Sequence, residues 1–134
     1  MNTILFVDDM EMIRNLMCNV LRRSGYSVLE AEDGWEALSL ARRQSGPIDL
    51  LITDIAMPRV GGLELRRDLR ASHPESSALF ISGHCEAELE LDAPFLRKPF
   101  TPASLLSLVS EILSMRAAPI DNQISNCGLI SLIN

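Results

Sequence analysis

The sequence predicts an α/β domain in which a doubly wound, five-stranded parallel sheet is covered by helices on both faces. Short apolar segments of β character alternate along the chain with longer segments of helical periodicity. The segment Leu50 to Asp54 is mostly branched and apolar up to its final carboxylate, which is typical of a strand buried on both faces of a parallel sheet. Polar residues follow several of these segments, at the strand ends where open α/β sheets bind their ligands.

Five segments have the composition of strands. Each is short and rich in apolar residues, and each is followed by a turn, a carboxylate or a proline. Because helical segments separate them, the strands are expected to pair in parallel through right-handed crossovers. The predicted strands are Thr3–Val7, Tyr26–Ala31, Ile48–Asp54, Ala78–Ser82 and Pro94–Arg97.

Four segments have the periodicity of amphipathic helices. The first begins near Met10 and is closed by Ser24-Gly25, and the last begins at Pro102 after an N-cap at Thr101. The two between them cover Trp35–Gln44 and Leu63–Ala71. The inward face of the first helix is predicted to be Ile13, Leu16, Met17, Val20 and Leu21, with Arg14, Arg22 and Arg23 off that face.

The connection between the fourth and fifth strands is short. Residues Cys85 to Leu91 are enough for two turns of helix at most. A helix at this point of the fold is therefore expected to be shortened or absent.

Length and charge limit the class of protein. The 134 residues are expected to form one domain, residues 1–116, and a C-terminal tail, residues 117–134. The excess of 18 acidic over 12 basic residues argues against a nucleic-acid partner. The sequence has neither a signal peptide nor a long apolar span, and its three cysteines lack metal-binding spacing, so we expect buried thiols, a cytoplasmic location and no membrane partner.

The tail differs in composition from the domain. It has one charged residue, Asp121, and ends in the apolar segment Leu129–Ile133. An apolar end is untypical of disordered segments. We hypothesise that the tail docks on its own domain or on a neighbouring copy of the chain.

Polar residues at the predicted strand ends should converge on one edge of the sheet. Asp8 and Asp9 follow the first strand, Asp54 ends the third, Ser82 ends the fourth and Lys98 follows the fifth. Three carboxylates at close quarters repel one another and require a positive partner. A divalent cation with oxygen ligands, Mg²⁺ above all, fits this set. Lys98, the only lysine among the 12 basic residues, would supply a second positive charge.

Four pieces of sequence resemble the response regulator receiver domains of two-component signalling. The resemblance covers Asn2 to about Arg116, and the four pieces occur in the order and at nearly the spacing of that family. It implies the flavodoxin-like version of the doubly wound fold. The matching pieces are Leu5-Phe6-Val7-Asp8-Asp9, Asp54-Ile55-Ala56-Met57-Pro58 followed by Gly62, Ile81-Ser82-Gly83, and Phe95-Leu96-Arg97-Lys98-Pro99-Phe100.

The resemblance implies a role for each matching residue. Asp54 would be the nucleophile that takes a phosphoryl group from a phosphohistidine, paired with Lys98 before the reaction. Asp9 would bind Mg²⁺ directly and Asp8 mainly through water, and the backbone carbonyl of Ala56 would complete the protein ligands with Asp54. Ser82 would donate its hydroxyl to the phosphoryl group, and Phe95 would turn inward when Ser82 moves. The Lys98-Pro99 peptide bond would be cis.

Each of these residues also has a simpler interpretation. Aspartates after a strand often cap the next helix, a serine at Ser82 could be a capping hydroxyl, and Phe95 could be an ordinary core residue. His73 and His84 are predicted to lie at the surface or in loops.

The resemblance also implies partners. A histidine kinase or histidine phosphotransfer protein would supply the phosphoryl group, and a downstream protein would read the result, with the chain a monomer or weak homodimer. The shortened fourth helix and the phenylalanine in place of tyrosine at Phe95 alter the surface that receivers use for output.

Two other functions fit parts of the sequence. A receiver fold could act as a constitutive binding module or as a phosphate sink with an altered output face. An aspartyl-phosphate phosphatase of the dehalogenase type would need a nucleophile and a general acid two residues apart, and neither Asp8-Asp9 nor Asp54-Ile55-Ala56 provides that spacing.

Overall fold

A computed structural model describes residues 1–83 and 93–116 of the chain. The predicted shortened fourth helix, His84, Cys85 and the tail lie outside these described residues. No helix within the described part is long and apolar enough to cross a membrane. The elements are β1 (Thr3–Val7), α1 (Glu11–Arg23), β2 (Ser27–Ala31), α2 (Gly34–Arg43), β3 (Leu50–Asp54), α3 (Gly62–Ser72), β4 (Ser77–Ser82), β5 (Phe95–Arg97) and α5 (Pro102–Arg116).

The five strands form one parallel sheet in the order β2-β1-β3-β4-β5. The prediction of a doubly wound parallel sheet is confirmed. In the register of β3 with β4, Asp54 lies opposite Ile81, and in that of β4 with β5, Ser82 lies opposite Arg97. The ends of the three strands are therefore level, which brings the residues that follow them to one edge.

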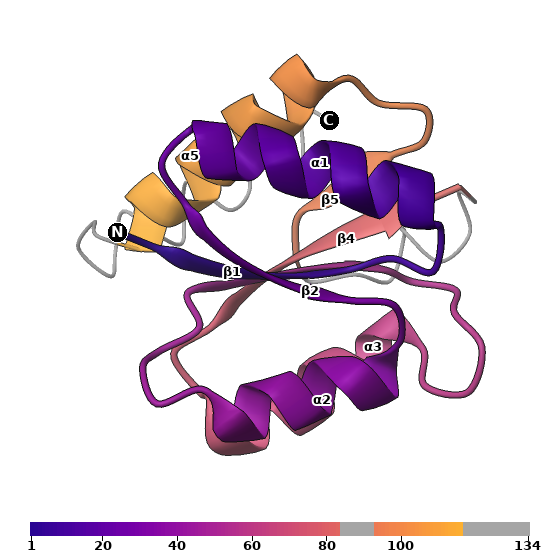
Figure 1. Cartoon of the computed structure of the whole chain (residues 1–134), viewed down its shortest axis with the longest axis vertical. Coiled ribbons are helices and arrows are strands. Elements are labelled where there is room, and N and C mark those ends of the chain that lie inside the picture. The colour runs from indigo at the N-terminus through magenta and orange to yellow at the C-terminus, as the bar shows by residue number, and fades with distance from the viewer. Residues whose placement is uncertain (84–92, 117–134) are drawn as a thin grey trace.

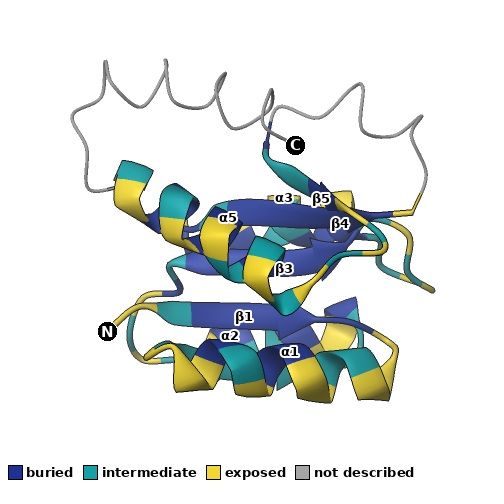
Figure 2. Ribbon diagram, turned by 90° about the horizontal axis from the view of Figure 1, so that it is seen from above, coloured by how far each residue is buried: buried dark blue, intermediate teal, exposed yellow. Residues whose placement is uncertain are grey.

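Helices cover both faces of the sheet (Figure 1). Along β1, Ile4 and Phe6 pack in the cluster under α1 and α5, whereas Leu5 and Val7 pack in the cluster under α2 and α3. This alternation follows from the two-residue period of a strand. It makes β1 and β3 apolar on both sides. In Figure 2, β1, β3 and β4 are accordingly almost entirely buried, while the outer sides of the helices are exposed.

One prediction about side chains is wrong. Leu16, assigned to the inward face of α1, is exposed, and the buried residues of that helix are Met17, Cys18 and Leu21. His73, predicted at the surface or in a loop, lies in the loop after α3 and is only 8% exposed. Its Nε2 lies 3.0 Å from the carbonyl oxygen of Ala41, so it joins the ends of α2 and α3.

Candidate functional site

Backbone hydrogen bonds hold the loops at the carboxyl edge of the sheet. The amide of Asp8 donates to the carbonyl of Ala31, and the amide of Ile55, directly after Asp54, donates to Ile81. The amide of Lys98 donates to the carbonyl of Ser82 over 2.8 Å, and the Lys98-Pro99 peptide bond is cis, as the resemblance implies. The backbone hydrogen bonds between neighbouring strands thus continue one residue into each loop. They fix the backbone positions from which the side chains of the site extend.

Asp8, Asp9 and Asp54 meet at this edge. One carboxylate oxygen of each lies within 4.8 Å of the others. Asp8 and Asp54 are buried, and Asp9 is exposed. Burial raises the pKa of Asp54 to about 6, and the negative charge of Asp8 adds to the rise. Burial also raises the pKa of Asp8, against the lowering effect of the hydrogen bond from the Met10 amide.

Lys98 is the cation that faces Asp54. Its Nζ lies 3.0 Å from Asp54 Oδ1, and its side chain is 32% exposed whereas that of Asp54 is 6% exposed. The hydrogen bond and charge of Lys98 lower the pKa of Asp54, but burial and Asp8 outweigh them. Lys98 therefore compensates only part of the negative charge at the site.

A small cavity opens beside Asp54. Its volume is about 210 Å³. The buried residue Ser82 contributes to its wall. The lining residues are Asp54, Ile55, Ala56, Ile81, Ser82, Gly83 and Lys98.

Gly62 packs against the backbone of Asp54 from the α3 side. Its amide donates to the carbonyl of Ile55 over 2.8 Å, and a side chain at this position would collide with the carbonyl of Asp54. The glycine in the matching sequence piece therefore serves a steric purpose. It lets α3 begin directly behind the phosphoacceptor candidate.

The donor set fits a hard divalent cation. Asp8 Oδ2 and Asp54 Oδ1 are buried without a hydrogen-bond partner among the described residues, although Asp54 Oδ1 has its ion pair with Lys98. Buried carboxylate oxygens left in this state are costly unless a cation meets them. Oxygen-only ligands of this kind suit Mg²⁺, which retains several of its waters in protein sites.

The helix-capping interpretation of the aspartate pair is wrong. The N-cap of α1 is Met10, and no side chain caps it. Asp8 instead accepts a hydrogen bond from the Met10 amide through Oδ1, 2.9 Å away, and its Oδ2 is buried without a hydrogen-bond partner among the described residues. The predicted cap at Thr101 is confirmed, since its Oγ1 accepts from the amide of Ser104.

Phe95 lies apart from the cavity. It is the first residue of β5, pairs in register with Phe80 and is half-buried against Phe80 and Ala93. It does not belong to the residues that line the space beside Asp54. Its predicted role as a switch residue stays a prediction.

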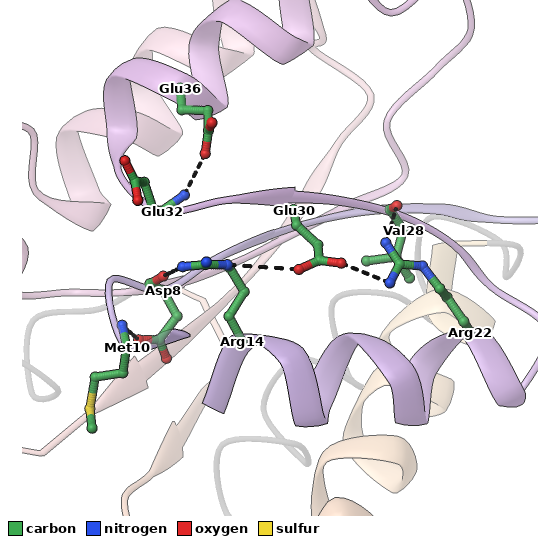
Figure 3. A network of polar contacts seen from close by, with 8 residues as sticks. All are labelled: Asp8, Met10, Arg14, Arg22, Val28, Glu30, Glu32 and Glu36. Carbon is green, nitrogen blue, oxygen red and sulfur yellow. Dashed lines mark hydrogen bonds and ion pairs between the residues drawn. The ribbon is translucent and has the colours of Figure 1, made fainter. Parts of the chain in front are cut away.

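Sequence reasoning missed one group of charges at the site. Arg14, which was placed off the inward face of α1, donates to the carbonyl oxygen of Asp8 and pairs with Glu30 on β2 (Figure 3). Arg22 contacts the same glutamate. The signal in the sequence was the placement of two arginines, each four residues from Cys18, together with a glutamate inside the strand Ser27–Ala31.

Comparison with known proteins agrees with this geometry. The sequence model of the response regulator receiver domain matches residues 4–110. The chain belongs to this family. Among receiver proteins, the response regulator receiver protein CpdR of Brucella abortus (strain 2308) is 34% identical over 124 residues, which cover 88% of this chain and 99% of CpdR.

Longer proteins contain a region that is similar to this chain. The sensor kinase CckA of Brucella abortus (strain 2308) is 35% identical over 117 residues, which cover 83% of this chain but 12% of the kinase. The chain likewise spans 50% of the transcriptional regulatory protein CpxR of Klebsiella pneumoniae.

Two crystal structures show the same fold. The receiver domain of the hybrid histidine kinase CckA superimposes with a TM-score of 0.74 at 39% identity, over 84% of this chain and 99% of that one. The chemotaxis protein CheY4 of Vibrio cholerae gives a TM-score of 0.75 at 29% identity, over 84% of this chain and 98% of that one.

Proposed function

We propose that this receiver domain accepts a phosphoryl group on Asp54 from a phosphohistidine and changes its protein contacts in response. The observation that carries the proposal is the buried carboxylate of Asp54, which borders a cavity of about 210 Å³ and lies 3.0 Å from Lys98. Asp8, Asp9, Asp54 and the backbone carbonyl of Ala56 would hold Mg²⁺. That ion, when bound, would neutralise negative charge on the phosphoryl oxygens.

The residues of the chain divide the work of the transfer. A carboxylate oxygen of Asp54 attacks phosphorus, the phosphorus–nitrogen bond of the donor breaks, and the imidazole leaves with that electron pair. An acyl phosphate forms on Asp54, and hydrolysis later returns the carboxylate. Lys98 turns from the carboxylate to the phosphoryl oxygens, and Ser82, in the cavity wall, donates its hydroxyl to them.

The cavity and Lys98 are the reasons why we assign the phosphoryl group to Asp54 rather than to Asp8 or Asp9. Asp54 is 4% exposed, borders the cavity and faces the ammonium of Lys98, whereas Asp9 is exposed. The low-dielectric surroundings strengthen each electrostatic contact with the transferred group.

The partners are part of the same proposal. The donor would be a histidine kinase or a histidine phosphotransfer protein, and the reader a downstream protein. The similarity to a sensor kinase, a stand-alone receiver protein and a transcriptional regulator supports partners of this class. A cytoplasmic location also belongs to the proposal, and the free thiol of Cys18 supports it.

Intact-mass spectrometry tests the chemistry. The protein is incubated with a small phosphodonor with and without Mg²⁺, and one phosphoryl group is expected to add only when Mg²⁺ is present. Asp54→Ala is expected to abolish the addition. Asp68→Ala, which removes a carboxylate of α3 whose side chain is 41% exposed, is the matched control and should leave the addition unchanged. Addition that survives Asp54→Ala would show that another residue is the acceptor.

A further inference from the structure

A set of charges links α1 to the loop that carries the aspartate pair (Figure 3). Arg14 Nη1 donates to the carbonyl oxygen of Asp8 over 2.9 Å. Nε of the same guanidinium lies 3.7 Å from Oε1 of Glu30 on β2, the edge strand of the sheet. One side chain therefore connects the β1–α1 loop with the strand beside it.

Glu30 is held from its other side as well. Its Oε2 lies 2.7 Å from Arg22 Nη1, and Arg22 Nη2 donates to the carbonyl of Val28 over 3.2 Å. Arg14 and Arg22 lie on one stripe of α1, on either side of the buried Cys18. The glutamate thus meets one arginine with each oxygen and orients the guanidinium of Arg14, whose side chain is 15% exposed.

The aspartate loop needs such a restraint because of its own charge. Oxygens of Asp8, Asp9 and Asp54 lie within 4.8 Å of one another, and their repulsion favours movement of the loop away from β3. The hydrogen bond from Arg14 opposes that movement at the Asp8 carbonyl. It leaves both carboxylate oxygens of Asp8 free for other contacts, one of which is the Met10 amide.

We propose that Arg14, oriented by Glu30, is a positioning residue that holds Asp8 and Asp9 in the arrangement that binds the divalent cation. The proposal rests on the function proposed above. Arginine suits the role because its planar fork reaches two acceptors that lie in different directions. A lysine at this position keeps the charge but cannot contact both the Asp8 carbonyl and Glu30.

Arg22 provides a matched control. It lies on the same helix and binds the same glutamate, but its second contact is the carbonyl of Val28 instead of that of Asp8. Replacing either arginine by methionine keeps most of the aliphatic stem and removes one ion pair with Glu30. Only the replacement of Arg14 removes a contact to the aspartate loop.

The test measures Mg²⁺ affinity of the unphosphorylated protein by isothermal titration calorimetry. Arg14→Met is expected to weaken Mg²⁺ binding about tenfold, because it removes a contact to a residue that would bind the ion. Arg22→Met removes no such contact and is expected to weaken binding less than about twofold. The Mg²⁺ affinity of Arg14→Lys should be closer to that of Arg14→Met than to that of the wild type. Arg14→Lys replaces Arg14→Met in the comparison if the methionine variant does not fold. Equal affinities in the wild type and the Arg14 variants, or equal losses in Arg14→Met and Arg22→Met, would overturn the proposal.

A second measurement needs no metal. The Met10 amide donates to Asp8 Oδ1, so its hydrogen exchange reports whether the loop stays in place. Exchange is expected to be faster in Arg14→Met than in Arg22→Met, and equal rates would overturn the proposal. If the wild type bound no Mg²⁺, the function proposed above would fail, and the exchange rates would still decide the role of Arg14.

Discussion

Replacing Asp54 by asparagine is expected to stabilise the fold at neutral pH. The carboxyl of Asp54 has its pKa raised from 3.8 to about 6, chiefly by burial. Because the pKa is higher in the folded state than in the unfolded state, the stability linked to the protonated form is complete below 3.8 and is lost as the pH rises through 6. The ionised side chain then lowers the free energy of unfolding by about 3 kcal/mol relative to the protonated one.

Asparagine removes this ionisation. Asp54→Asn is therefore expected to raise the free energy of unfolding by about 1–3 kcal/mol at about pH 7.5 without divalent ions, with the lower values arising because Lys98 loses its anionic partner. At about pH 4 the wild-type carboxyl is protonated in the folded state, so the difference should be small. With Mg²⁺ present it should also shrink, since binding to the native state stabilises the wild type.

Urea unfolding followed by circular dichroism at both pH values, with and without Mg²⁺, measures these differences. Asp68→Asn makes the same chemical change on α3, at a side chain that is 41% exposed, and should alter the free energy of unfolding by less than about 0.5 kcal/mol. The reasoning is refuted if Asp54→Asn is no more stable than the wild type at about pH 7.5, or if its advantage persists unchanged at about pH 4.

Two further substitutions separate the site from the scaffold. Gly62→Ala should lower the free energy of unfolding by about 1–3 kcal/mol and slow phosphorylation, because its methyl group displaces the Asp54 backbone. Gly46→Ala should do neither, since its methyl group would lie 3.8 Å from Gln44 Nε2, an ordinary contact, and equal behaviour of the two variants in urea unfolding and mass spectrometry would contradict this. His73→Ala should lower the free energy of unfolding by about 2 kcal/mol, because it removes a buried side chain and its hydrogen bond to the Ala41 carbonyl, which keeps its bond from the Gln44 amide. Phosphorylation should be unchanged, since His73 precedes β4 at the opposite edge of the sheet, and slower phosphorylation would show that the two edges are coupled.

The sequence predicts the strands and the site well because both depend on local patterns. The strand bounds differ by at most a residue or two from those observed, since apolar segments bounded by turns leave few alternatives. Parallel pairing then brings Asp8, Asp9 and Asp54 together without further information. The chemistry of the site could therefore be predicted from which residues end the strands.

Side chains whose surroundings depend on tertiary packing could not be predicted in the same way. On α1, Leu16 is exposed although it was predicted to face inward, and Arg14 contacts β2 although it was predicted to lie off the inward face. The reason is that the edge strand β2 lies under the side of α1 that contains Cys18 and carries Glu30 there. The burial of His73 could not be predicted, because its ring contacts the Ala41 carbonyl, which belongs to another helix. In each case an apolar or charged residue type indicates little until the neighbouring element is known.

The charge balance of the site explains why the added phosphoryl group should change the structure around it. Three carboxylates face one ammonium, so two negative charges are uncompensated before anything binds. A divalent cation would cancel them.

A phosphoryl group on Asp54 replaces one negative charge by about two, and the site again carries excess negative charge. The nearest groups able to respond are Lys98, which is part-exposed and can move, and the hydroxyl of Ser82 in the cavity wall. Because the amide of Lys98 donates to the carbonyl of Ser82, movement at either position pulls on the other. The response to phosphorylation is therefore expected to begin at the ends of β4 and β5, while the aspartate loop at the end of β1, held by Arg14, stays in place.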